Sequence, residues 1–453
     1  MIEMMISAPN SGSGKTAVTC ALLTVLQRRG YDPCAFKCGP DYIDPMFHRS
    51  VLGVESHNLD GYLAVREQVQ TLYRRAAAGH GAAVCEGVMG FYDGVGGTTT
   101  QASAWELADT LNLPVILIVR PKGSSLTLAA QLRGLCSFRN PSHIVGVILN
   151  DCSEMLYRTL APMLERESGL AVLGFLPHMQ EAQLESRHLG LYTAQEISDL
   201  DTRIGRIADQ MEHSVDVLRL LSLCSTAESA QTYSEILPES DVRIAFASDE
   251  AFCFTYEENK EELRRHGAEP VEFSPLHDKQ LPDNIHGLYL PGGYPELYAK
   301  QLSDNRSMRE SIRRACQDGL PTIAECGGFL YLGASLRDQR GTSYDMVGFL
   351  DGCGSSQGRL VRFGYAELTA KADSMLFRAG ERIRTHEFHH WDSTDSGGDL
   401  TAKKPVSGRS WTCGIVTETL YAGFPHLYFA GYPQLAARFL EAARRYKEAE
   451  HEA

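Results

Sequence analysis

Residues 10–16 read Asn-Ser-Gly-Ser-Gly-Lys-Thr, and this stretch decides the fold of the first part of the chain. An apolar run at residues 4–6 precedes it, and apolar residues such as Val18 and Leu22 follow it at helical spacing. The pattern predicts a short buried strand, a tight glycine turn and an amphipathic helix that ends at Gly30. A helix that begins after small residues offers its free backbone N–H groups to an anion. We therefore expect a phosphate-binding loop.

The predicted nucleotide site consists of this loop and the first helical residues. Its members are Ser11, Gly12, Ser13, Gly14, Lys15 and Thr16. Lys15 supplies a charge for the terminal phosphates, and the Thr16 hydroxyl is suited to Mg²⁺. The full Walker A pattern has a glycine where this chain has Pro9, so only the second half of the pattern matches. The alternative is a helix start with an exposed lysine, but the flanking strand and helix favour the phosphate loop.

Length, charge and cysteine usage limit the class of protein. A chain of 453 residues is too long for one core and predicts two or three domains. The net charge of −14 argues against a nucleic-acid-binding surface, because phosphate backbones need basic patches. Twelve scattered cysteines indicate reduced thiols and a cytoplasmic protein. We expect no signal peptide and no membrane span, since the apolar runs are short.

The first half of the chain alternates short apolar segments with helical ones. The strand candidates are residues 4–7, 82–85, 115–119, 144–149 and 172–175, and helical stretches include 65–78 and 124–136. This alternation predicts an α/β domain with a parallel sheet that is covered on both faces. Ligands of such sheets bind at the carboxyl ends of the strands.

Several polar residues follow these strands. Glu86 ends one strand beside the phosphate loop and is the second predicted Mg²⁺ ligand, although a turn-forming acid is the alternative. Asp93 lies on the same loop. The stretch at 37–45, Lys-Cys-Gly-Pro-Asp-Tyr-Ile-Asp-Pro, would by itself be a surface turn. Asn150 is a weak candidate for an adenine contact.

Residues 225–241 are polar with few apolar anchors, and we interpret them as a linker between two domains. The predicted domains are residues 1–224 and 242–440, followed by a charged tail at 441–453. In the second domain the alternation resumes, with strands expected at 242–247, 269–273, 287–290 and 322–324 and helices at 257–266 and 305–318. Further strands are expected at 360–368, 382–390 and 414–429, before a charged helix at 432–450.

A second chemical centre is predicted at Cys326, where an apolar strand ends and two glycines lead into a helix. A nucleophile on such a sharp turn needs small neighbours. The earlier turn Pro-Gly-Gly at 291–293 could form an oxyanion hole from the N–H groups of Gly293 and Gly327. His426 is the candidate base. Each feature alone has an ordinary structural explanation, but their combination favours a catalytic thiol.

Residues 386–390, His-Glu-Phe-His-His, match the H-E-x-x-H pattern of zinc proteases. That motif requires a helix so that both histidines share a face. The flanking residues predict a strand that runs into a turn, and on a strand His389 faces away from His386. We therefore expect a polar or substrate-facing strand here, with no zinc catalysis.

These motifs together resemble the cobyrinate a,c-diamide synthase family. In the first half of the chain the resemblance rests on the phosphate loop, the loop at 37–45, Glu-Gly-Val-Met-Gly-Phe-Tyr-Asp at 86–93 and Ser-Arg-His-Leu-Gly-Leu at 186–191. In the second half it rests on Asp-Glu-Ala-Phe-Cys-Phe at 249–254, Leu-Pro-Gly-Gly-Tyr-Pro-Glu at 290–296 and Glu-Cys-Gly-Gly at 325–328. It implies a P-loop ATPase domain similar to dethiobiotin synthetase, followed by a class I glutamine amidotransferase domain.

The resemblance also implies the chemistry. Glutamine would be hydrolysed at Cys326 with His426 as base, and ATP with Mg²⁺ would phosphorylate a substrate carboxylate that ammonia then converts into an amide. Phosphorylation is needed because a carboxylate is a poor electrophile. The implied substrate is cobyrinate, amidated at its a and c carboxylates in cobalamin biosynthesis. The implied substrate-binding residues are Asp41, Tyr42, Asp44, Asp93, Arg187 and His188.

One position departs from amidotransferases generally, whose triads place a glutamate two residues after the histidine. This chain has Tyr428 there. Either Cys326 and His426 act as a dyad, or another acid such as Glu418 orients the histidine. Weak glutaminase activity, or the use of free ammonia, is a reasonable hypothesis.

Two alternatives remain open. The first keeps the fold and changes the substrate to hydrogenobyrinate or nickel-sirohydrochlorin. The second is a partitioning-type P-loop ATPase that assembles on a membrane or DNA, which would lack the second α/β domain. A homodimer is a possible assembly, and we expect no nucleic-acid partner.

Overall fold

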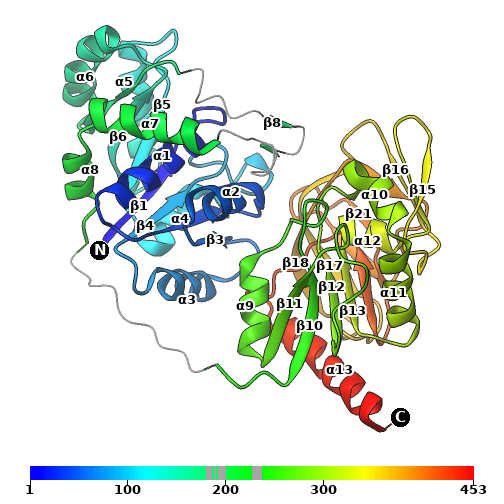
Figure 1. Cartoon of the computed structure of the whole chain (residues 1–453). Coiled ribbons are helices and arrows are strands. Elements are labelled where there is room, and N and C mark those ends of the chain that lie inside the picture. The colour runs from blue at the N-terminus through cyan, green and yellow to red at the C-terminus, as the bar shows by residue number, and fades with distance from the viewer. Residues whose placement is uncertain (180–185, 188–189, 192–199, 227–236, 453) are drawn as a thin grey trace. The chain divides into compact units, whose positions relative to one another are not determined.

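The computed structural model describes residues 1–179, 186–187, 190–191, 200–226 and 237–452, which form two compact units, Met1–Ser234 and Glu235–Ala453 (Figure 1). The predicted linker spans their boundary, and its residues 227–236 lie outside the described ranges. All twelve cysteines are described, and none of them forms a disulfide.

The first unit is built on a seven-stranded sheet in the order β3-β2-β4-β1-β5-β6-β7, with every neighbouring pair parallel. Its strands are β1 (Ile2–Ser7), β2 (Pro33–Cys38), β3 (Ser56–Leu59), β4 (Ala82–Glu86), β5 (Val115–Val119), β6 (Ile144–Asn150) and β7 (Ala171–Leu176). The predicted parallel α/β domain is confirmed. In the register of the sheet Glu86 pairs with Ile6 and Lys37, so the ends of β1, β2 and β4 meet at one edge.

Helices cover both faces of this sheet. They are α1 (Lys15–Arg28), α2 (Ile43–Leu52), α3 (Arg66–Ala77), α4 (Ala104–Leu111), α5 (Leu126–Phe138), α6 (Glu154–Ser168), α7 (Leu200–Ser214) and α8 (Val217–Leu223). Apolar residues of α1, α7 and α8 share one core with alternate strand residues such as Ala35. The next residue, Phe36, points to the opposite face and contacts Tyr73 of α3. A two-residue hairpin, β8 (Ser186–Arg187) and β9 (Gly190–Leu191), completes the described part of this unit.

The second unit contains a six-stranded sheet in the order β11-β10-β12-β13-β23-β22, in which only the edge strand β22 is antiparallel. Its strands are β10 (Val242–Ala247), β11 (Ala268–Phe273), β12 (Gly287–Leu290), β13 (Thr322–Glu325), β22 (Ile415–Val416) and β23 (Leu420–Gly423). The helices are α9 (Glu257–Arg265), α10 (Ala299–Asp304), α11 (Arg306–Gln317), α12 (Gly327–Leu332) and α13 (Pro433–Glu452). Apolar residues of α9 and α13 pack in one core, and those of α10, α11 and α12 pack in another.

Two smaller sheets account for the late strands. One has the order β18-β17-β20-β21, and its strands are β17 (Arg362–Ala370), β18 (Arg382–His389), β20 (Leu400–Lys403) and β21 (Ser410–Cys413). The other has the order β15-β14-β16-β19, with β14 (Ser335–Arg337), β15 (Ser343–Asp345), β16 (Cys353–Ser356) and β19 (Trp391–Ser393). Residues 386–389 of the H-E-x-x-H stretch lie on β18 and His390 follows the strand in a bend, so the predicted strand that runs into a turn is confirmed.

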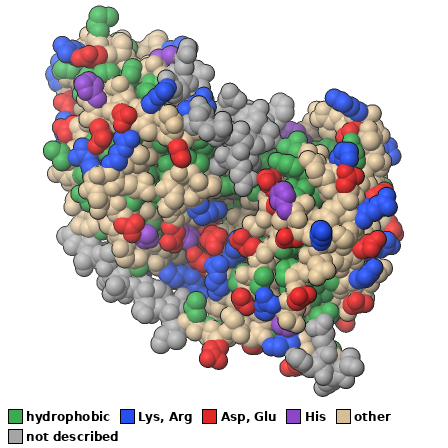
Figure 2. Space-filling model, in the orientation of Figure 1, with side chains coloured by type: hydrophobic (Ala, Val, Ile, Leu, Met, Phe, Trp, Pro, Cys, Tyr) green, Lys and Arg blue, Asp and Glu red, His purple; other side chains and the backbone are tan. Residues whose placement is uncertain are grey.

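The last helix and the surface complete the description. The division expected at residues 440 and 441 falls inside α13, where Ala442 and Ala443 are buried. Figure 2 shows charged side chains of both signs mixed over the face in view, in line with an acidic but mixed composition. Within the described ranges, each helix is either too short or too polar to cross a bilayer.

Candidate active sites

The phosphate loop of the first unit has the predicted form. Gly14 precedes α1 with φ of 94°, a left-handed conformation that glycine adopts without strain. Lys15 is buried at the first position of the helix, and its Nζ donates to the Met89 carbonyl at 2.6 Å. Burial lowers the pKa of Lys15 to about 8, and nearby Lys37 adds to the shift. The ammonium is therefore held over the loop by backbone carbonyls.

Asn150, at the end of β6, stabilises this loop by a hydrogen bond. Its side-chain Nδ2 donates to the Ser13 carbonyl at 2.8 Å. A Cβ atom on Gly14 would lie only 2.2 Å from the same nitrogen, so the amide fits closely against the turn. The Asn150 amide therefore helps to hold the loop, and its contact with adenine stays a prediction.

Four side chains from four elements converge beside the loop. Lys37, from the end of β2, forms buried ion pairs with Asp44 of α2 and with Glu86 of β4; the distance from its Nζ to the Glu86 Oε1 is 2.8 Å. The Thr16 hydroxyl donates to the same Glu86 oxygen at 2.7 Å and lies 3.4 Å from the Asp44 Oδ2. The structure thus brings together three predicted site residues with Lys37, for which the sequence predicts no role.

Burial and mutual charge set the ionisation of this cluster. Burial raises the pKa of the Glu86 carboxyl to about 7, opposed by Lys37 and reinforced by Asp44. For Asp44, burial favours the protonated form, but Lys37 outweighs it and lowers the pKa. Burial also disfavours the charge of Lys37, yet the two carboxylates raise its pKa well above the ordinary value. Lys37 is therefore cationic, and its closest anionic partner is Asp44.

The donor set of this cluster fits Mg²⁺. Thr16, Asp44 and Glu86 present hard oxygen atoms, which this cation prefers. The second oxygen of Glu86, Oε2, is buried and has no hydrogen-bond partner within the described part of the chain. An unpaired carboxylate oxygen beside a phosphate loop is a suitable ligand position.

The remaining predicted substrate residues lie in different surroundings. Asp41 is half-buried and accepts from the Ile43 N–H at 2.9 Å, and burial together with Asp44 raises its pKa to about 6. Tyr42 is buried at the start of α2. Asp93 is exposed and accepts from the Gly90 N–H at 3.0 Å, so it closes a turn.

Arg187 and His188, the other two predicted substrate residues, are described only in part or not at all. The backbone of Arg187 belongs to β8, but its side chain is not described, and His188 lies outside the described residues.

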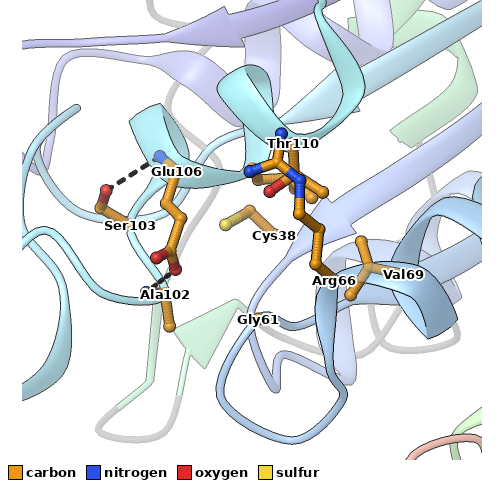
Figure 3. Close-up of a pocket in the computed structure, with 9 residues that line it drawn as sticks. Cys38, Gly61, Arg66, Val69, Ala102, Ser103, Glu106 and Thr110 are labelled. Atoms are coloured by element: carbon orange, nitrogen blue, oxygen red, sulfur yellow. Dashed lines mark hydrogen bonds between the residues drawn. The ribbon is translucent and has the colours of Figure 1, made fainter.

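A pocket opens on the α3 and α4 face of the same unit (Figure 3). It is lined by Cys38, Gly61, Arg66, Val69, Ala102, Ser103, Glu106, Leu107 and Thr110. Its polar groups are engaged in capping α4, because Ser103 accepts from the Glu106 N–H and Glu106 accepts from the Ala102 N–H. We assign it no ligand.

In the second unit Cys326 sits on the predicted sharp turn between β13 and α12. It is buried, and its backbone has φ of 48° and ψ of −101°, a strained conformation for a non-glycine residue. Its N–H donates to the Gly423 carbonyl at 2.8 Å, which ties the turn to the end of β23. Because His426 lies three residues after the end of β23, this pairing brings the two predicted catalytic segments together.

The glycines of the earlier turn make room for this arrangement. A Cβ atom on Gly292 would lie 2.6 Å from the Cε1 atom of His426, so only glycine leaves space for the imidazole. The Gly293 nitrogen lies 3.0 Å from the position that a Cβ on Gly327 would occupy. The two predicted oxyanion residues are therefore close neighbours, as a shared binding site for one oxygen requires.

His426 is buried and held from two sides. Its backbone N–H donates to the His386 carbonyl at 2.9 Å, and its Nδ1 lies 3.4 Å from the Oε2 of Glu325. The other oxygen of Glu325 accepts from the Leu427 N–H at 2.8 Å. Glu418 is exposed on the turn between β22 and β23. The acid beside the histidine is thus Glu325, and the suggestion of Glu418 is wrong.

The surroundings of the thiol disfavour its charged form. Burial raises the pKa of the Cys326 thiol, and Glu296, Glu325 and Glu387 add to the shift. Burial lowers the pKa of His386 to about 3, so this neighbour of His426 is neutral. His389 stacks on Phe424 with ring centroids 3.9 Å apart, and its Nδ1 lies 2.5 Å from the Trp391 carbonyl. The histidines of β18 are therefore packed around the catalytic segment.

Known proteins match the chain over most of its length. A family model described as a CobQ/CobB/MinD/ParA nucleotide binding domain matches residues 4–191. A second model, described as a CobB/CobQ-like glutamine amidotransferase domain, matches residues 243–433.

Two similar whole proteins carry the same name. A cobyrinate a,c-diamide synthase of Caldanaerobacter subterraneus is 37% identical over 96% of this chain and 97% of its own. That of Clostridium acetobutylicum is 39% identical over 95% of this chain and 98% of its own. Among solved structures, PurLQS from Thermotoga maritima matches 45% of this chain and 98% of its own at 18% identity and a TM-score of 0.32, a likeness too weak to carry a conclusion.

Proposed function

The chain belongs to the cobyrinate a,c-diamide synthase family, and from that membership we propose how its residues divide the reaction between the two units. It is a glutamine-hydrolysing ligase that binds ATP and amidates a tetrapyrrole acid in cobalamin biosynthesis. The substrate is cobyrinate, and its a and c carboxylates become amides. The observation that carries the proposal is the presence of a strained, buried thiol and a phosphate loop in one chain.

The second unit releases ammonia from glutamine. The thiol proton of Cys326 passes to His426 as the sulfur attacks the side-chain amide carbon, and the N–H groups of Gly293 and Gly327 bind the oxyanion. When the carbon–nitrogen bond breaks, the nitrogen takes the proton back from His426 and leaves as ammonia. Water then hydrolyses the thioester to glutamate and restores the thiol.

The first unit activates the carboxylate. A carboxylate oxygen of the substrate attacks the γ-phosphorus of ATP, and ADP leaves. Ammonia then attacks the acyl carbon, and phosphate departs to leave the amide. Lys15 binds the terminal phosphates, and Lys37, fixed by Asp44 and Glu86, is placed to neutralise charge that builds up on the transferred phosphoryl group. Thr16, Asp44 and Glu86 would hold Mg²⁺, which when bound neutralises phosphate charge.

The residues that contact the tetrapyrrole follow the same edge of the sheet. Asp41 and Tyr42 lie in the loop between β2 and α2, next to Asp44. Asp93 lies close enough to Lys15 to influence its charge. We propose that these residues border the reacting carboxylate, together with Arg187 and His188.

Removal of the thiol tests this division. Cys326→Ala should abolish amidation with glutamine and retain amidation with ammonium salts, measured as the mass of the tetrapyrrole product after turnover. Wild-type enzyme should convert two acids into amides. An unaltered tetrapyrrole with both nitrogen sources, or full glutamine-dependent activity in Cys326→Ala, would contradict the proposal. Parallel reactions with hydrogenobyrinate and nickel-sirohydrochlorin identify the preferred substrate.

A further inference from the structure

The position where amidotransferases generally place the triad acid is filled here by a tyrosine. Tyr428 is buried, and its ring packs edge-on against Tyr256 at a centroid distance of 5.0 Å. A phenol in an aromatic contact cannot supply the negative charge that orients a catalytic histidine. A carboxylate with this role must come from another element.

Glu325 occupies the required place. It is the last residue of β13, directly before Cys326, and its side chain is 3% exposed. One carboxylate oxygen is fixed by the Leu427 N–H at 2.8 Å, and the other lies 3.4 Å from the Nδ1 of His426. The acceptor is therefore held by the backbone of the same segment that carries the histidine.

The orientation of the imidazole follows from these contacts. The carboxylate faces Nδ1 and favours a proton there, so that Nε2 is the unprotonated nitrogen that can take the proton of a thiol. On the other side, Gly292 lets the ring approach the backbone of the glycine turn. Within the described part of the chain, the titratable groups next to His426 include Glu325 from β13 and the neutral His386 from β18. Glu325 is the carboxylate that pairs with it.

We propose that Glu325 is the positioning residue of His426 and replaces the missing triad acid from the strand that carries the nucleophile. This inference rests on the proposed glutaminase function of the second unit. The proposed site differs from the usual triad in the position of the acid, which precedes the cysteine in sequence instead of following the histidine. The position of Tyr428 is thereby free for packing.

The test compares Glu325→Gln with Glu418→Gln as the matched control on an exposed turn. The amide oxygen of glutamine can still accept from the Leu427 N–H, but its NH₂ group would face Nδ1 and force the proton onto Nε2. Glutamine-dependent kcat should fall roughly 10²–10⁴-fold, the size of a lost general base. Amidation with ammonium salts should stay at the wild-type rate, and Glu418→Gln should match wild type with both nitrogen sources.

The split between kcat and KM separates positioning from a structural role. Because the proposed role of the carboxylate is to orient the base, its loss should lower kcat for glutamine and leave KM for glutamine near the wild-type value. Glu325→Asp should restore part of the rate. The inference is overturned by a wild-type glutaminase rate in Glu325→Gln, by an equal loss of ammonia-dependent activity, or by a change confined to KM. Failure of the wild-type enzyme to use glutamine would instead refute the proposed function.

Discussion

Replacement of Gly292 by alanine should lower the glutamine-dependent rate although it replaces no titratable side chain. The new Cβ would lie 2.6 Å from Cε1 of His426, whereas ordinary contacts begin at 3.4 Å, so the ring must move by about 0.8 Å. A displacement of that size in a reacting group costs on the order of 10²-fold in rate. The added methyl should also lower the free energy of unfolding by about 1–3 kcal/mol, as overpacking does.

The assay measures glutamine-dependent and ammonia-dependent amidation side by side, with urea unfolding of the same samples. Gly398→Ala is the matched control, because a Cβ at that position meets no atom within 4 Å. We expect the glutamine-dependent rate of Gly292→Ala to fall while its ammonia-dependent rate and both rates of the control stay unchanged. A wild-type glutamine rate in Gly292→Ala would show that the imidazole position is not set by this glycine, and the reasoning would fail.

Two further predictions concern the first unit. Burial raises the pKa of Glu86 to about 7 from 4.5. The protonated carboxyl therefore contributes to the free energy of unfolding in full below pH 4.5, and this contribution is lost as the pH rises through 7. The glutamine of Glu86→Gln does not titrate, so the unfolding free energy of this variant relative to wild type should increase by roughly 3 kcal/mol between pH 4.5 and 8 in urea titrations. Its ATP-dependent activity should be lost. A difference in unfolding free energy that does not change with pH would refute the assignment. Asn150→Ala removes the hydrogen bond to the Ser13 carbonyl, worth about 1 kcal/mol. The variant should raise KM for ATP roughly fivefold in steady-state kinetics, with little change in KM for ammonia. An unchanged KM for ATP would show that the loop does not depend on this hydrogen bond.

The sequence was sufficient where local pattern and function coincide. The phosphate loop, Glu86 and Cys326 were all found because each lies where an apolar strand gives way to small or polar residues. Sequence reasoning does not predict β2 and β3, because the apolar run of β2 is only Cys34, Ala35 and Phe36 and β3 has none. β2 carries Lys37 into the site, and β3 is Ser-His-Asn-Leu, whose Asn58 is buried because its amide donates to the Gly39 and Asp41 carbonyls. A polar strand of this kind is visible only once its partners are known.

Glu325 could not be found by sequence reasoning for a different reason. Adjacent residues of a strand point to opposite faces, so proximity to Cys326 in the chain does not imply a shared site. The spacing rule of amidotransferases pointed to position 428 instead. Only the pairing of β13 with β23, which places Glu325 opposite Gly423, brings the carboxylate to the segment that carries His426.

The electrostatics of Cys326 explain why that carboxylate matters. Reactive cysteines usually lie in electropositive surroundings that stabilise the thiolate. Here burial and three nearby glutamates raise the pKa of the thiol, and α12, which begins directly after it, has only six residues. The thiol therefore stays protonated at rest, and its deprotonation depends on transfer to His426. Because the rate then depends on where Nε2 points, the groups that fix the imidazole, Gly292 by its missing side chain and Glu325 by its charge, control glutamine hydrolysis as directly as the nucleophile does.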